Sequence, residues 1–369
     1  MISTVSRDAI LTALTAVNRC TEARNSLPIL GCTLLTFHPD RVELTGTNME
    51  MALIASVPAV CDEGASVAVP AKALLGFVKS VPKGSQIAMT ASDDGLKVSA
   101  GGMTTTLPVS KAKDFPTVTA GEFAHEFRMP MADLHRMMRQ TAPSMSTEAT
   151  RYYLNGFFLA PKNGMLRAVA TDGHRLVISD VDLPAGAAGM EGVIFPRESS
   201  GALMAMFGSK PSGDVVVSVS DTRVMIQFNG MTFLTKLVDG VFPEYERVIP
   251  RPSGNVLRTD AGELATLATS MSKAVSNERC QAVKLTLDRE KCLVSAMNYE
   301  GGHSEGVLNG ITRWSGEALE VGYQARYLKT LLGPVSGPVQ FDIPGMSAPC
   351  TITSEADPSW KAVLMPIRI

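Results

Sequence analysis

The sequence lacks the long apolar runs and paired cysteines that would assign it at once to a membrane or disulfide-rich class. No apolar stretch approaches the roughly 20 residues that a membrane-spanning helix needs. The six cysteines form no CxxC pair and have no histidine at ligand spacing. We therefore expect buried, reduced thiols, no metal and no cofactor. The N-terminal residues show no basic segment with a cleavage site, so we interpret them as mature sequence of a cytoplasmic protein.

Catalytic motifs are equally scarce. The sequence holds no GxSxG, HExxH, Walker A or GxGxxG pattern. The string Thr171-Asp172-Gly173-His174-Arg175 could supply an acid–base pair, and a hydrolase that uses Asp172 and His174 stays open as an alternative. We favour a tight turn that orients the histidine, because such strings commonly follow apolar strands. We therefore expect a protein that is not an enzyme.

One pattern occurs three times along the chain, and it is the strongest signal in the sequence. An apolar strand, a short helix, a Gly/Pro break and alternating strands recur at 67–118, 193–248 and 321–369. Each copy is preceded by three strands joined by turns, at 27–57, 152–181 and 279–308. Copies of this length suit independent domains. The repeats predict an α+β protein with domains 1–121, 122–249 and 250–369.

Positive charge concentrates on the predicted helices, although the net charge is −2. The segments 72–83, 131–143, 260–275 and 325–332 each have an apolar stripe and cations on the opposite face. In the second of these we expect Arg136, Arg139 and Gln140 outside. Helices gathered on one side would give a surface that attracts a polyanion without base readout. Ordinary solvation of each helix is the alternative.

Several segments, in order along the whole chain, resemble one known family. They are LPILG at 27–31, TGTNMEM at 45–51, RYYLNG at 151–156, VATDGHRL at 169–176, Pro196-Arg197, KLVDGVFPEYERVIP at 236–250, SNE at 276–278 and VLMPIRI at 363–369. Together they resemble the bacterial DNA sliding clamp, the β subunit of DNA polymerase III.

The resemblance implies three tandem clamp domains in a head-to-tail homodimer, with helices lining a ring and antiparallel sheets outside. Such a ring encircles duplex DNA regardless of sequence and serves as a processivity factor. Its implied protein partners are the replicative polymerase α subunit, the clamp loader and other proteins with a clamp-binding motif. A repeat scaffold that binds only proteins is the alternative we keep.

Two sets of site residues follow from the resemblance. For a partner-peptide pocket between the second and third domains it implies Leu154, Thr171, Gly173, His174, Arg175, Leu176, Pro243, Arg247, Val248, Gln324, Tyr327, Val363, Met365, Pro366 and Arg368. For the DNA-facing side it implies Arg24, Arg151, Tyr152 and Tyr153. The helix-face pattern adds Lys72, Lys79, Arg136, Arg139, Arg197 and Lys273.

The sequence departs from the family pattern at three places. Cys280 stands where a bulky apolar residue is common in the pocket, and Glu198 stands where a basic residue is common. The strand expected at the dimer contact, with Met103, Thr104 and Thr105, is unusually polar, and Ala274-Val275 opposite it is small. We expect a dimer that dissociates more readily than is typical for the family.

Overall fold

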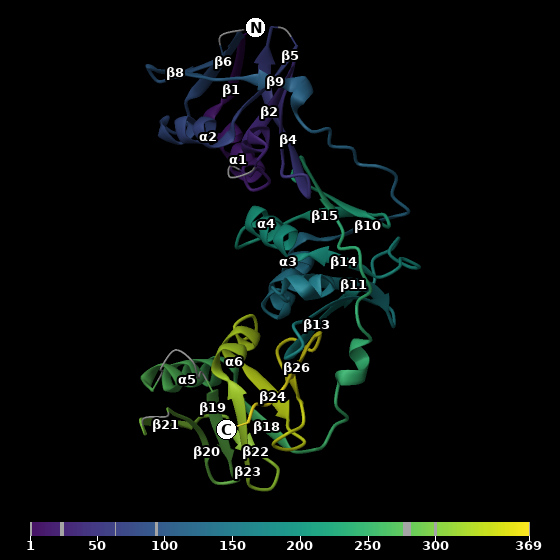
Figure 1. Ribbon diagram of the computed structural model, residues 1–369, viewed down its shortest axis with the longest axis vertical. Helices are drawn as coiled ribbons and strands as arrows, with labels where there is room; N and C mark the ends of the chain where they lie inside the picture. Colours follow the sequence, from purple (N-terminus) through teal and green to yellow (C-terminus); the bar gives the residue numbers. More distant parts are fainter. Residues whose placement is uncertain are drawn as a thin grey trace. The chain divides into compact units, whose positions relative to one another are not determined.

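A strand, a helix and three further strands follow one another repeatedly along the chain (Figure 1). The computed structural model describes residues 2–22, 26–62, 64–92, 95–275, 282–298 and 301–368. The first repeat of the sequence contains β1 (Ile2–Ser6), α1 (Arg7–Val17), β2 (Cys32–His38), β3 (Arg41–Thr47), β4 (Met51–Cys61), β5 (Ala65–Pro70), α2 (Ala71–Ser80), β6 (Gln86–Ser92), β7 (Gly95–Ala100) and β8 (Met103–Leu107).

The second and third repeats continue this order. The second contains β10 (His125–Pro130), α3 (Met131–Thr141), β11 (Gly156–Lys162), β12 (Met165–Thr171), β13 (Arg175–Asp182), β14 (Val193–Pro196), α4 (Arg197–Phe207), β15 (Asp214–Val219), β16 (Arg223–Phe228) and β17 (Met231–Lys236). The third contains β18 (Val256–Asp260), α5 (Ala261–Ala274), β19 (Ala282–Leu287), β20 (Cys292–Met297), β21 (His303–Leu308), β23 (Leu319–Gln324), α6 (Ala325–Leu332), β24 (Pro338–Asp342), β25 (Cys350–Ser354) and β26 (Trp360–Leu364).

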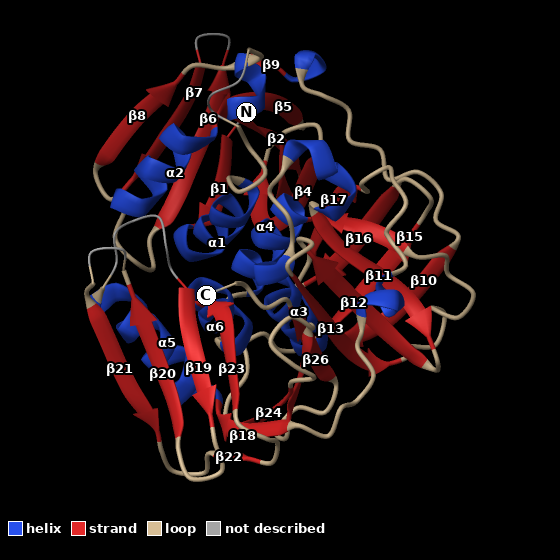
Figure 2. Ribbon diagram, turned by 60° about the horizontal axis from the view of Figure 1, so that its bottom comes forward, coloured by secondary structure: helices blue, strands red, loops and turns tan. Residues whose placement is uncertain are grey.

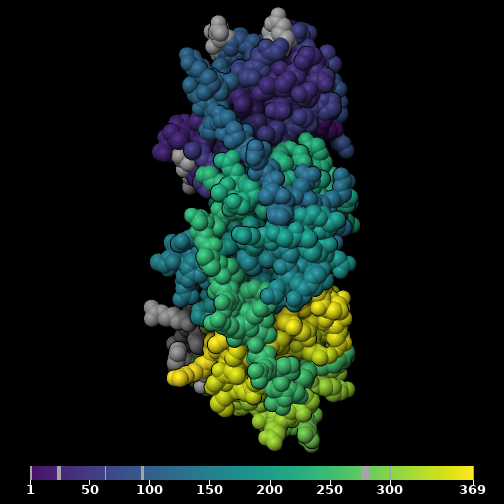
Figure 3. All heavy atoms as spheres, turned by 90° about the vertical axis from the view of Figure 1, so that its right-hand side faces the viewer, coloured from purple at the N-terminus to yellow at the C-terminus, as the bar shows by residue number. Residues whose placement is uncertain are grey.

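Short elements complete the chain. They are the strands β9 (Ser110–Lys111) and β22 (Arg313–Trp314) and the 3-10 helices η1 (Pro28–Gly31), η2 (Ala112–Asp114), η3 (Ala142–Ser144), η4 (Ala149–Leu154) and η5 (Tyr245–Val248). η5 lies in the connection 238–255, which is largely exposed at the surface (green in Figure 3).

Helix boundaries agree with the sequence pattern to within a few residues, and local chemistry explains the differences. α6 spans the predicted residues. α2 ends at Ser80, short of the predicted Lys83, because Val81 precedes a proline and is therefore biased towards an extended backbone. α5 starts directly after Asp260, whose side chain accepts a hydrogen bond from the Glu263 amide at 2.9 Å and so caps the helix.

The chain forms two compact units, and the division between them falls within the central repeat. Unit 1 comprises Met1–Ala132 and Gly201–Leu237, and unit 2 comprises Asp133–Ser200 and Val238–Ile369. The division arises because strands pair across repeats: β17 pairs with β4 in unit 1, and β13 pairs with β26 in unit 2. The boundaries 1–121, 122–249 and 250–369 therefore describe sequence repeats and stay a prediction.

Unit 1 is built on one 13-stranded sheet. Its main path runs β10-β15-β16-β17-β4-β1-β6-β7-β8, and β2, β3, β5 and β9 branch from it. α1 packs against β3 and β4 and lies beside α2. This packing buries Ile10 and Leu14 of α1 and Leu74 of α2. β8 pairs only with β7 among the described strands and so forms a sheet edge.

Unit 2 contains two antiparallel sheets. One runs β14-β11-β12-β13-β26-β25-β24-β18-β22, and the other runs β21-β20-β19-β23. Figure 2 shows the second sheet with α5, which packs against β20 and β21. The core between helices and sheets includes the fully buried Tyr323, Phe341 and Trp360.

The described cysteines Cys20, Cys32, Cys61, Cys292 and Cys350 are free and buried, as expected from their spacing. Burial raises the pKa of both Cys20 and Cys350 to about 12, so these thiols stay protonated and unreactive at neutral pH. None of the helices in the described ranges is long and apolar enough to cross a membrane. Cys280 lies outside the described residues.

A polar network in unit 2 joins α3 to the turn between β25 and β26, and it corrects one expectation. Gln140 is not outside but 2% exposed, because it donates to Asp357 at 2.7 Å and accepts from Ser179 at 2.6 Å. Arg136 is half-buried: it donates to Ser359 at 2.7 Å and to the Asp180 carbonyl at 3.0 Å. The helix-face argument failed here because another segment of the chain covers the polar side of α3.

Candidate functional site

The turn between β12 and β13 is held by its own side chains. Thr171 Oγ1 donates to the Arg175 carbonyl at 2.8 Å and accepts from the Gly173 amide at 3.1 Å. Asp172 Oδ1 accepts from the amides of His174 and Arg175, both at 3.0 Å. Gly173 has φ 88°, a conformation that favours glycine. The string is thus a tight turn, as the sequence indicated.

Asp172 and His174 do not form an acid–base pair. The Asp172 carboxylate binds the Arg175 guanidinium at 3.0 Å, and the His174 ring stacks on Tyr327 with centroids 6.0 Å apart. Arg175 also lies 4.5 Å above the Tyr327 ring. Burial lowers the pKa of Arg175, which the Asp172 carboxylate partly offsets. These contacts use both groups for packing and orientation, which disfavours the hydrolase alternative.

A cavity of about 200 Å³ opens beside this turn. In the part of the chain that the structure describes, its walls are Leu154, Thr171, Gly173, His174, Arg175, Leu176, Pro243, Glu244, Tyr245, Val248, Val363 and Met365. Its floor is formed by Leu154, Leu176 and Val363, which also belong to a buried apolar cluster. Leu176 and Val363 face each other across the β13–β26 pair. Strand pairing and burial thus hold these floor residues in place.

The mouth of the cavity carries two exposed apolar side chains. Val248 is 52% exposed and Met365 is 40% exposed. The Met365 amide donates to the His174 carbonyl at 2.9 Å, which fixes the chain just after β26. Exposed apolar groups around a preformed apolar hollow are typical of a binding site for an apolar ligand segment.

Ten of the residues implied by the resemblance line this cavity, and the other five do not belong to its described walls. Arg247 is ion-paired with Glu244, Tyr327 contacts His174 and Arg175, and Gln324 directly precedes α6. Pro366 and Arg368 follow Met365 without forming the described walls. Glu244 and Tyr245 were missed, although they lie within the matching segment 236–250. Residues 276–278 and Cys280 lie outside the described residues.

The cations expected on helices are mostly exposed. Lys72 and Lys79 on α2, Arg139 on α3, Arg197 at the start of α4 and Lys273 on α5 are all exposed. Arg139 donates to the Pro334 carbonyl at 3.1 Å. Arg136 differs, because its hydrogen bonds and the Asp357 carboxylate at 3.5 Å engage its guanidinium. The Arg136 guanidinium is therefore less available to a phosphate than the exposed cations are, which weakens its prediction as a DNA-facing residue.

The RYYLNG segment forms most of η4. Arg151 forms an ion pair with Glu148 at 3.4 Å, and 49% of its side chain is exposed. Tyr152 is 54% exposed and meets the ring of Tyr153 edge-on, whereas Tyr153 packs on the apolar cluster beneath the cavity. Arg24, the other residue implied here, lies outside the described residues.

The residues expected at a dimer contact lie on a sheet edge and a helix end. Met103 and Thr104 are exposed on the edge strand β8, and Thr105 is half-buried. Ala274 is exposed at the end of α5, and Val275 just after it is 9% exposed. β21, packed beside α5, is the corresponding edge of the four-stranded sheet in unit 2.

Comparison with known families covers nearly the whole chain. The DNA polymerase III beta subunit matches as three successive domains: the N-terminal domain at residues 1–119, the central domain at 128–244 and the C-terminal domain at 246–368. These matches confirm the three tandem clamp domains and the α+β fold class.

Individual relatives agree over their full lengths. The beta sliding clamp of Caulobacter vibrioides is 34% identical and that of Pseudomonas aeruginosa 32% identical, each with 99% of both chains covered. The solved sliding clamp of Bartonella birtlesii bound to griselimycin superposes with a TM-score of 0.95 at 32% identity, covering 100% of both chains. The Pseudomonas aeruginosa clamp bound to griselimycin gives 0.94 at 31% identity, again covering 100% of both. The chain therefore belongs to the DNA polymerase III beta subunit family, the beta sliding clamps, which are non-catalytic processivity factors of DNA replication.

Proposed function

We propose that this protein forms a homodimeric ring that encircles duplex DNA, slides along it and tethers replication proteins. The observation that carries the proposal is the match to the family in all three domains over the whole chain. Exposed cations on the helices, such as Lys79, Arg139 and Lys273, support it, because attraction to phosphates needs charge but no base contacts. Because a closed ring surrounds the DNA, it would stay on the duplex without tight contacts between protein and DNA. A separate ATP-dependent loader would open it.

We further propose that the cavity beside the β12–β13 turn binds the hydrophobic motifs of partner proteins. Its apolar floor at Leu176 and Val363, and Met365 at its mouth, suit leucine-like side chains. Two related clamps are described as bound to griselimycin, which makes that compound a useful probe for this chain. The replicative polymerase α subunit and the clamp loader are the expected partners, in the cytoplasm.

The dimer would form by pairing of sheet edges. β8 in unit 1 and β21 in unit 2 each have one unpaired edge among the described strands. Antiparallel or parallel pairing of two such edges in a head-to-tail dimer would satisfy their free backbone groups and close the ring.

Retention on circular DNA tests the ring directly. The labelled protein is loaded on a nicked plasmid with a bacterial clamp loader and ATP, and bound protein is measured before and after linearisation. We expect retention on circles in moderate salt and loss from linear ends. Equal loss from both would contradict encirclement and favour the protein-only scaffold, whereas equal retention would indicate ordinary DNA binding.

The dimer is expected to dissociate at higher concentration than a clamp with bulky apolar contacts. Met103, Thr104 and Ala274 are exposed, but only the methionine offers a large apolar surface. A loss of about 100 Å² of apolar contact corresponds to roughly 2.5 kcal/mol, or nearly two orders of magnitude in Kd. Sedimentation velocity from micromolar to nanomolar concentration measures this, and absence of monomer at nanomolar concentration would refute it.

A further inference from the structure

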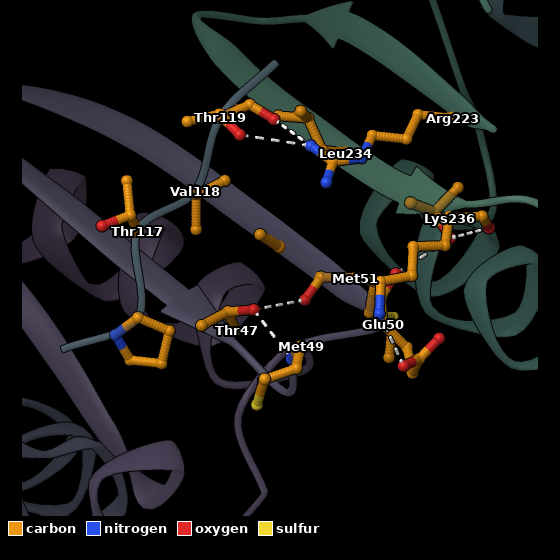
Figure 4. A pocket seen from close by; sticks show the side chains of 13 residues that line it. Thr47, Met49, Glu50, Met51, Thr117, Val118, Thr119, Arg223, Leu234 and Lys236 are labelled. Atoms are coloured by element: carbon orange, nitrogen blue, oxygen red, sulfur yellow. Dashed lines mark hydrogen bonds and ion pairs between the residues drawn. The ribbon is translucent and has the colours of Figure 1, made fainter. Parts of the chain in front are cut away.

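A second cavity, in unit 1, has no role in the function proposed above. It has a volume of about 260 Å³ and lies between the β3–β4 turn, the segment 116–119 and the facing ends of β16 and β17 (Figure 4). Met49, Met51, Val118 and Leu234 give it apolar walls, and Arg223 and Lys236 bring two cations. All of these residues belong to unit 1.

This cavity is the counterpart of the first one in the preceding repeat. Thr47 Oγ1 donates to the Met51 carbonyl at 2.9 Å and accepts from the Met49 amide at 3.0 Å. Asn48 accepts from the Met51 amide at 2.9 Å. The turn that begins at Thr171 has the same bonds, with Asp172 in the place of the asparagine.

The strand that closes the cavity also corresponds. Ala52 pairs with Leu234 as Leu176 pairs with Val363. The Lys236 amide donates to the Glu50 carbonyl at 2.9 Å, as the Met365 amide donates to the His174 carbonyl. The backbone frame is therefore shared, while the side chains differ.

Met49 occupies the position that Gly173 holds in the first cavity. Its φ is 75°, a left-handed conformation that is unfavourable for a methionine but easy for glycine. The residue is nevertheless 51% exposed, so packing of the methionine within this chain does little to offset the cost of that backbone conformation. Retained strain of this kind is a feature of binding sites. A flexible thioether at the mouth of a cavity can adapt to an incoming side chain.

The charges at the rim are unbalanced. Arg223 and Lys236 are direct cross-strand neighbours on β16 and β17, and like charges in such a pair repel. Lys236 pairs with Glu50 at 3.0 Å. Within the described ranges, the Arg223 guanidinium donates to the carbonyl and hydroxyl oxygens of Thr119. The guanidinium has further donors, which suit a carboxylate.

We propose that this cavity, framed by the turn Thr47–Met51, is a second binding site, for an extended peptide segment in which an acidic side chain adjoins an apolar one. The carboxylate would pair with Arg223, and the apolar side chain would contact Met49 and Leu234. The choice of a peptide rests on the proposed function of the first cavity, whose backbone frame this site shares. Because its rim carries Arg223 and Lys236, this site should prefer a different peptide sequence from the first cavity.

Methionine methyl spectra can follow both cavities in the full-length protein at once. The protein is labelled with [methyl-13C]methionine, and signals of Met49, Met51 and Met365 are assigned from single Met→Leu variants. The probe is acetyl-Ser-Leu-Asp-Leu-Ser-amide, and its Asp→Asn analogue is the matched control. A hydrophobic clamp-motif peptide, read at Met365, tests the first cavity separately.

We expect saturable shifts of the Met49 and Met51 signals with the Asp probe. Binding should weaken roughly three- to tenfold with the Asn analogue or with Arg223→Gln, and stay unchanged with Lys97→Gln, which removes an exposed cation elsewhere in unit 1. If Arg223→Gln perturbs the free spectrum, the Asn analogue still removes the charge from the other partner.

Absence of Met49 shifts at millimolar probe, or equal binding of the two analogues, would overturn the proposal. So would shifts at Met49 caused by duplex DNA and not by the Asp probe. A clamp-motif response at Met365 without any response at Met49 would remove the second site and leave the first intact.

Discussion

Met365→Ala is expected to weaken binding of a hydrophobic clamp-motif peptide roughly three- to eightfold. The side chain stands at the mouth of the cavity, 40% exposed, and a bound peptide would bury it. Fully burying a methionine stabilises a complex by about 1.5–3 kcal/mol, so burying the 40% that is exposed contributes about 0.6–1.2 kcal/mol, where 1.4 kcal/mol is a factor of ten in Kd. Fluorescence anisotropy of a labelled peptide measures the change.

Met346→Ala is the matched control for this effect. Met346 is 65% exposed in unit 2 but does not belong to the described walls of the cavity. Its truncation should leave peptide affinity within twofold. Both variants should unfold at nearly the wild-type temperature, because neither side chain is buried. Equal affinities of wild type and Met365→Ala would place the motif elsewhere.

Asp357→Ala is expected to lower the free energy of unfolding of unit 2 by about 2–3 kcal/mol. The carboxylate accepts from Gln140 at 2.7 Å and lies 3.5 Å from Arg136, with 25% of its side chain exposed. Its removal leaves the buried Gln140 amide without this acceptor and leaves Arg136 with only the longer ion pair to Asp133, at 3.8 Å. The magnitude stays below that of a fully buried pair because both partners reach solvent. Urea unfolding followed by circular dichroism measures it.

Two variants separate charge from hydrogen bonding at this position. Asp357→Asn keeps the shape and removes the charge, and a double-mutant cycle with Arg136→Met gives the coupling energy. Asp221→Asn, at an exposed aspartate, is the control and should be neutral. A neutral Asp357→Ala would show that solvent replaces the whole network.

The contribution of Asp357 should also depend on pH. Burial by itself raises the pKa of Asp357, but hydrogen bonds from Ser359 and Gln140 and the charge of Arg136 outweigh it and lower the pKa overall. A carboxyl with a lowered folded-state pKa stabilises fully above its unfolded value of about 4, and this stabilisation disappears as pH falls through the folded pKa. The difference between wild type and Asp357→Asn should therefore shrink below about pH 4.

The candidate site was partly accessible from sequence, and the failures have a common cause. The matching segments contained all twelve residues that line the first cavity, and ten of these had been predicted, including Leu176 and Met365. Tyr245 lay within a matching segment, but nothing in the sequence of that segment distinguished residues that line the cavity from their neighbours. Gln140 and Arg136 were assigned to solvent because periodicity describes one helix alone. A helix face that is polar can still be covered by another segment.

The sequence by itself determined the three repeats, the order of strands and helices and the family, because these depend on local patterning and on motifs preserved in order. Only the tertiary structure decided which edges pair, such as β4 with β17 and β13 with β26. It also decided that the turns at Thr47 and Thr171 each frame a cavity. Strand pairing and cavity walls join residues far apart in sequence, and hydrogen bonding between backbones carries no residue-specific signal that the sequence could reveal.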